Sequence, residues 1–101
     1  MSEAALEHRG DGRYALCGPL DYGSVAALLQ QGRAAFSAHP EVELDLAGVT
    51  RANSAGLALL LEWLDDSRDG GYRIQLRNLP ASLAAIARIS NLHQLLPLPQ
   101  D

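Results

Sequence analysis

The stretch from Val49 to Leu61 constrains the fold most, because an alternating strand ends there and a leucine-rich helix begins. A short polar turn over residues 49–53 is expected to join them, with Ser54 at the helix start. The first turn of a helix has unpaired backbone N–H groups and the positive end of the helix dipole, so a phosphate or a partner's acidic group would be stabilised at Ser54. Asn and Ser are also favoured N-cap residues, so Asn53 or Ser54 could simply cap the helix.

Composition is that of one globular domain over residues 1–101, with 48% hydrophobic and 20% charged residues. The net charge of -4 and the absence of lysine argue against nucleic acid as a partner. The single cysteine, Cys17, excludes an internal disulfide and is compatible with a cytoplasmic location. The first residues do not resemble a secretory signal and no run is long enough to span a bilayer, so any membrane contact is expected to be indirect.

The first half of the chain predicts a β-hairpin, a helix and a strand. The hairpin pairs residues 6–9 with 13–17 across the turn Gly10-Asp11-Gly12, and Gly18-Pro19 is expected to end it. An amphipathic helix is expected over residues 24–36, followed by a strand over 41–46. That strand alternates three aliphatic side chains with the carboxylates of Glu41, Glu43 and Asp45.

The second half predicts a central helix, a strand and a third helix. The central helix runs from Ser54 to Arg68, and Gly70-Gly71 ends it; its core stripe comprises Leu57, Leu60, Leu61 and Leu64. A strand over residues 72–77 and a helix over 81–91, with Pro80 in its first turn, precede an apolar tail over 92–101. The order β-β-α-β-α-β-α predicts an α/β fold, a mixed four-stranded sheet with helices on one side.

An outward-facing apolar pair is expected on the central helix. At 100° per residue, Leu59 and Trp63 fall away from the core stripe and lie one turn apart, so they suggest an interface. Alternatively, Trp63 folds over a neighbouring element and belongs to the core. Under the first interpretation, one docking strip runs along the helix through Ser54, Ala55, Leu59, Glu62 and Trp63.

The sequence offers no catalytic, cofactor or metal site. His8, His39 and His93 lie in separate expected elements, and Cys17 has no metal-type partner nearby. The three carboxylates of residues 41–45 are more simply a hydrophilic strand face than a cation site. Ser54 lacks the G-x-S-x-G elbow and a histidine base that a nucleophilic serine needs. We therefore expect a binding protein and not an enzyme.

A family resemblance rests on the strand Leu44-Asp45-Leu46, the turn 49–53 and the run Ser54 to Leu61. Together they resemble the STAS domain, the fold shared by anti-sigma factor antagonists and the tails of sulfate transporters, and the resemblance covers nearly the whole chain. Within the family, the run Gly56 to Leu61 and the short length look most like the MlaB type, the STAS subunit of a bacterial phospholipid ABC transporter.

The resemblance implies a non-enzymatic cytoplasmic subunit, held at the inner membrane only through its partner. It would bind the transporter's ATPase, in a complex with the permease, and support the system that maintains outer-membrane lipid asymmetry. The partner-binding residues expected from the resemblance and from the helix face are Arg51, Asn53, Ser54, Ala55, Leu59, Glu62 and Trp63.

One departure from the family pattern concerns Ser54. STAS proteins usually carry Asp immediately before the helix-start Ser or Thr, whereas this chain has Asn53. The missing carboxylate favours ATPase recognition over phosphorylation at Ser54. The alternatives are an anti-sigma factor antagonist released from its kinase-like partner when Ser54 is phosphorylated, and a homodimer formed through Leu59 and Trp63.

Overall fold

The computed structural model describes residues 3–96. Its elements follow the order expected from the sequence, with one additional 3-10 turn near the carboxyl end. Their bounds are β1 Ala5–Gly10, β2 Arg13–Leu20, α1 Val25–Phe36, β3 Glu41–Ala52, α2 Ser54–Gly70, β4 Arg73–Arg77, α3 Ala81–Ile89 and η1 His93–Leu95.

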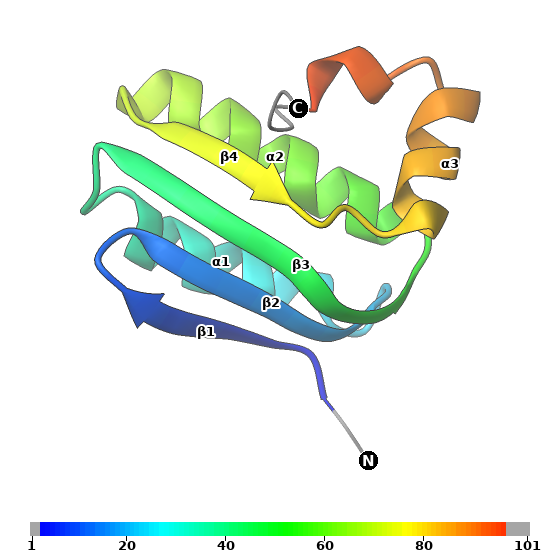
Figure 1. The fold of residues 1–101 in the computed structure, drawn as a ribbon, viewed down its shortest axis with the longest axis horizontal. Coiled ribbons are helices and arrows are strands. Elements are labelled where there is room, and N and C mark those ends of the chain that lie inside the picture. The colour runs from blue at the N-terminus through cyan, green and yellow to red at the C-terminus, as the bar shows by residue number, and fades with distance from the viewer. Residues whose placement is uncertain (1–2, 97–101) are drawn as a thin grey trace.

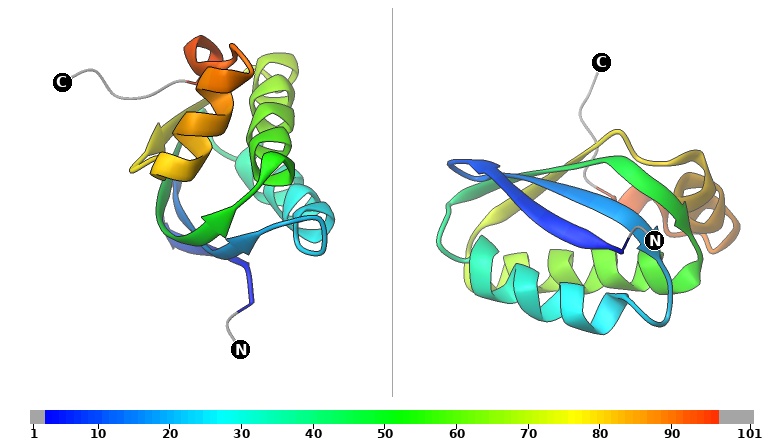
Figure 2. Two further views of the ribbon diagram at one scale, coloured as in Figure 1. Left: turned by 90° about the vertical axis from the view of Figure 1, so that its right-hand side faces the viewer. Right: turned by 90° about the horizontal axis from the view of Figure 1, so that it is seen from below.

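The four strands form one mixed sheet in the order β1-β2-β3-β4 (Figure 1). β1 is antiparallel to β2, while β2, β3 and β4 are mutually parallel. The helices α1 and α2 lie side by side on the same face of this sheet (Figure 2), and within residues 3–96 no element covers the opposite face. The predicted α/β fold with helices on one side is confirmed.

β2 is longer than predicted, because Gly18-Pro19 does not end it. The strand continues to Leu20, with irregular pairing on either side of Gly18, whose φ is +87°. Pairing with β1 reaches only Cys17, so at Pro19 the strand has β3 alone as its neighbour. Proline has no backbone N–H to donate, so it is tolerated in a strand where one side of that strand is unpaired.

β3 also extends beyond its predicted end. The prediction of a polar turn over residues 49–53 is wrong, because residues 49–52 belong to this strand. The strand continues to Ala52, which pairs with Leu20 at the end of β2. β4 pairs with β3 only as far as Asp45, so the second half of β3 is held by β2 alone. Polar side chains such as Thr50 and Arg51 are exposed there, which explains why this strand segment looks like a turn in the sequence.

The helix ends are close to those predicted. Gly71, with φ of +74°, closes α2 by donating its N–H to Ser67 O, as the glycine pair suggested. Pro80 is the N-cap of α3 and does not lie in its first turn, and α3 ends at Ile89, two residues early. Beyond η1, Leu96 is buried in the core, and the remainder of the predicted apolar tail, residues 97–101, lies outside the described residues.

None of the helices within residues 3–96 combines the length and the apolar character that crossing a membrane requires.

Candidate functional site

Asn53 caps α2 and leaves Ser54 free of that role. The Asn53 side chain is the N-cap acceptor, because its Oδ1 lies 2.8 Å from the Ala55 N–H that donates to it. The Asn53 backbone N–H donates to Leu20 O at 3.2 Å, which fixes the helix start to the end of β2. Of the two residues that could cap the helix, Asn53 therefore does so.

The Ser54 hydroxyl is exposed and shares a hydrogen bond with a residue that sequence reasoning missed. Ser54 Oγ lies 3.2 Å from the Tyr22 hydroxyl, and either oxygen can donate. Tyr22 lies in the loop between β2 and α1 and is 76% exposed. In the sequence, Tyr22 is noticeable only as an aromatic residue that belongs to none of the apolar patterns. Its contact with Ser54 joins residues that are 32 positions apart in the chain.

Arg51 lies beside the same helix start. Its guanidinium Nη2 is 3.7 Å from Asp21 Oδ2, and the Arg51 side chain is 76% exposed. Both residues line a surface pocket of about 310 Å³, together with Leu20, Ala52 and Asn53. We call the set Tyr22, Arg51, Asn53 and Ser54 the helix-start surface. It offers two hydroxyls, an amide and a cation.

The prediction that Leu59 and Trp63 face outward from α2 is wrong, since their side chains are only 3% and 1% exposed. Ala55, which was expected on the same strip, is 6% exposed. The Trp63 indole N–H donates to Leu29 O at 3.2 Å, and its ring packs edge-on against Phe36 with ring centroids 5.1 Å apart. The alternative interpretation, in which Trp63 belongs to the core, is therefore correct.

The physical reason is that α2 is the middle helix, with α1 against one flank and α3 near the other (Figure 2). Gly32 of α1 makes room for the indole, because a Cβ there would lie 2.3 Å from Trp63 Nε1. Glu62 is exposed as expected but is paired with Arg33 at 3.3 Å. Of the predicted strip, only Ser54 and Glu62 reach the surface.

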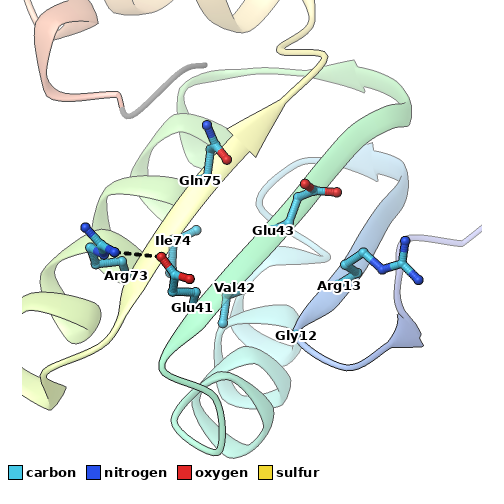
Figure 3. Close-up of a pocket in the computed structure, with 8 residues that line it drawn as sticks. All are labelled: Gly12, Arg13, Glu41, Val42, Glu43, Arg73, Ile74 and Gln75. Atoms are coloured by element: carbon cyan, nitrogen blue, oxygen red, sulfur yellow. Dashed lines mark hydrogen bonds and ion pairs between the residues drawn. The ribbon is translucent and has the colours of Figure 1, made fainter. Parts of the chain in front are cut away.

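The acidic row of β3 is a hydrophilic face, as predicted. Glu41 pairs with Arg73 at 2.6 Å (Figure 3), and Glu43 pairs with Arg77 at 2.7 Å. Asp45 accepts hydrogen bonds from the Asn78 side chain and the Ala47 N–H, and these lower the pKa of its carboxyl below the ordinary value. A surface pocket of about 480 Å³ includes Glu41, Glu43 and Arg73 among its lining residues. Its carboxylates are already occupied by cationic partners.

Two of the histidines come together, although their separate sequence positions gave no hint of it. His8 and His39 have ring centroids 6.0 Å apart, and Tyr14 contacts both. His39 Nε2 lies 3.1 Å from the Tyr14 hydroxyl. Over residues 3–96, no group of three His, Cys, Asp or Glu side chains is arranged to hold a metal ion.

Comparison with known proteins identifies the family. A family model described as "Mlab, STAS domain" matches residues 5–97. A search of curated protein sequences gave no significant match.

Among solved structures, an anti-sigma factor antagonist from Mycobacterium paratuberculosis is 22% identical with a TM-score of 0.71, and the match covers 97% of this chain and 85% of that one. The unphosphorylated anti-sigma factor antagonist SpoIIAA is 18% identical with a TM-score of 0.69, covering 97% of this chain and 87% of that one. The phosphorylated Bacillus SpoIIAA is 17% identical with a TM-score of 0.69, and the match covers 97% of this chain and 92% of that one.

A crystal structure of Mglu is 25% identical with a TM-score of 0.59, covering 76% of this chain, but this chain spans only 19% of that structure's length. The anti-sigma factor antagonists share the fold described above over almost the whole chain. The family match over residues 5–97 and the shared fold lead to one conclusion: this chain belongs to the STAS domain family.

Proposed function

We propose that this domain is a non-enzymatic cytoplasmic subunit that binds the ATPase of a phospholipid ABC transporter and supports the maintenance of outer-membrane lipid asymmetry. The observation that carries the proposal is the exposed Ser54 hydroxyl, which capping by Asn53 leaves available at the start of α2. The family model named for Mlab supports the choice of partner, since it spans residues 5–97. Contact with the inner membrane is then indirect, through the ATPase and its permease.

The helix-start surface is suited to docking and not to catalysis. The hydroxyls of Tyr22 and Ser54 can each donate and accept hydrogen bonds, and the exposed Arg51 can pair with a carboxylate. Among the described residues, the side chain that bonds Ser54 Oγ is Tyr22, whose phenol hydroxyl does not supply the general base that an imidazole nitrogen would. The histidines His8 and His39 lie with Tyr14, near the opposite end of β3 from Ser54. A nucleophilic role for Ser54 would need such a base beside it.

The test is calorimetric titration of the chain with the purified ATPase of the phospholipid transporter from the same cells. The wild-type chain is expected to bind, and Ser54→Glu to bind at least about tenfold more weakly, because it adds bulk and negative charge at the contact. Ser37→Glu is the matched control, since Ser37 is an exposed serine at the carboxyl end of α1, whereas the helix-start surface lies beside the amino end of α1. Absence of wild-type binding, or unchanged binding of Ser54→Glu, would contradict the proposal.

A second function, anti-sigma factor antagonism, is favoured by a different observation. The chain shares its fold with both the phosphorylated and the unphosphorylated SpoIIAA over 97% of its length. A phosphate on the exposed Ser54 would add roughly two negative charges at the start of α2 and change what the surface can bind. Mass spectrometry of the chain purified from its own cells distinguishes the two functions. A phosphorylated Ser54, together with a co-purified kinase-like anti-sigma factor, would favour the antagonist.

A further inference from the structure

We infer that Tyr22 is the aromatic anchor through which the helix-start surface holds its partner. The inference rests on the proposed function and adds the residue and the chemistry of recognition. The partner it fits is a protein surface with an apolar pocket for the Tyr22 ring and a neighbouring carboxylate that pairs with Arg51.

The first argument is exposure. The chain has five Phe, Trp and Tyr residues, all of them within residues 3–96. Four are core residues with at most 8% exposure: Tyr14, Phe36, Trp63 and Tyr72. Tyr22 is 76% exposed, beside the predicted contact residue Ser54. Tyrosine and tryptophan are enriched among the residues that dominate binding energy, so an exposed tyrosine at a docking surface is a strong candidate.

The second argument is preorganisation of the turn that carries Tyr22. Asp21 Oδ1 accepts from the Gly23 N–H at 3.0 Å, and Ser24 Oγ accepts from the Asp21 N–H at 3.1 Å. Ser24 Oγ also donates to Pro19 O at 2.9 Å, which secures the turn to the end of β2. The hydrogen bond between the hydroxyls of Tyr22 and Ser54 then restricts the orientation of the Tyr22 ring. Less conformational entropy is lost when such a side chain is buried by a partner.

The third argument concerns charge around the ring. Gly23 precedes α1, Ala26 lies in its first turn, and Ala58 lies one turn beyond Ser54; all three are exposed and uncharged. Arg51 lies beside Asp21, the residue that precedes Tyr22, and the contact between their side chains is long at 3.7 Å. A carboxylate of the partner could therefore replace Asp21 at little cost. This arrangement favours an apolar pocket with an acidic neighbour over a strongly charged surface.

A second copy of the chain fits this surface less well. Most homodimers are related by a twofold axis, which brings the same patch of both subunits together. If Tyr22 stacked on its own symmetry mate, the two Arg51 side chains would approach each other as like charges. The acidic group that complements Arg51 is better supplied by a different protein.

The experiment compares three variants in the calorimetric titration with the transporter ATPase. Tyr22→Ala is expected to weaken binding by at least about tenfold, whereas Tyr22→Phe, which keeps the ring, stays within roughly threefold of wild type. Ile89→Ala is the matched control, because Ile89 is an exposed large apolar residue on α3, at 86%, and its loss should leave binding unchanged. Fluorescence of Trp63, the single tryptophan, verifies that each variant is folded.

The possible outcomes separate the two proposals. If wild type binds and Tyr22→Ala binds equally well, the anchor inference is overturned while the proposed function stands. If Tyr22→Phe loses as much affinity as Tyr22→Ala, the hydroxyl and not the ring is responsible, which also overturns it. If wild type does not bind the ATPase, both fail. A dimer of the isolated chain that Tyr22→Ala dissociates would make a second copy the occupant and overturn the choice of partner.

Discussion

The start of α2 and the middle of the same helix differ in what they show to solvent. At the start, Asn53 caps the backbone and Ser54 lies on the surface, although Ala55 and Leu57 of the same turn are buried. About one and a half to two and a half turns later, Leu59 and Trp63 are buried, and Trp63 packs against α1. Both regions seemed equally suited to bind a partner when only the sequence was considered. The middle of the helix therefore stabilises the fold, and its start is where we propose that a partner binds.

The largest effect is expected from the middle of the helix. Trp63→Ala should lower the free energy of unfolding by about 3–5 kcal/mol, because it removes a buried indole and leaves a cavity beside Gly32. Urea denaturation followed by circular dichroism measures this. Tyr22→Ala is the control, and as an exposed substitution it should change stability by no more than about 0.5 kcal/mol. A stable Trp63→Ala variant that loses only partner binding would reverse the contrast.

The start of the helix should show a smaller effect on stability. Asn53→Ala removes the N-cap acceptor of Ala55 N–H and is expected to cost about 1 kcal/mol in urea denaturation. Asn53→Asp keeps an acceptor and should fold as stably as wild type, while restoring the carboxylate that STAS proteins usually have there. Equal stability of Asn53→Ala and wild type would mean that the cap is not needed.

The smallest effect is expected from the exposed ion pairs that join α1 to α2. Arg33 pairs with Asp66 at 2.7 Å and with Glu62 at 3.3 Å, and the hydrogen bond that Arg33 donates to Asp66 raises the pKa of the Arg33 guanidinium. Arg33→Ala should destabilise the domain less than Asn53→Ala, because water and salt screen exposed pairs. Thermal unfolding at low and high salt measures the change, which should shrink at high salt. Arg88→Ala, an exposed arginine of α3, is the control.

Local patterns predicted the elements well because each pattern is contained in a short segment. The turn Gly10-Asp11-Gly12 and the apolar spacing of α1 are readable without knowledge of the rest of the chain. The ends of β2 and β3 were less predictable, since Pro19 is tolerated in a strand only where one neighbouring strand has already stopped, and β3 continues beyond its pairing with β4 by following β2. That depends on the lengths of other strands.

The candidate site was predictable only in part. Ser54 and its helix start follow from the local sequence, but the burial of Trp63 depends on which helix lies beside it. Gly32 was the complementary signal, a residue without a side chain on the buried face of α1, and it has meaning only once α1 and α2 are known to be adjacent. Tyr22 could not be assigned for the same reason, because its partner Ser54 is in another element.

The distribution of acidic residues along α2 has a consequence for folding. Its first turn has no acidic residue, whereas Asp65, Asp66 and Asp69 lie in its carboxyl-terminal half. This is the reverse of the arrangement that a helix dipole favours, so a peptide of this segment should form little helix alone. The helix then depends on packing against α1 and the sheet for its stability. The proposed docking end of the domain is consequently formed only when the whole domain folds, and a partner that binds there would select completed molecules over partly folded ones.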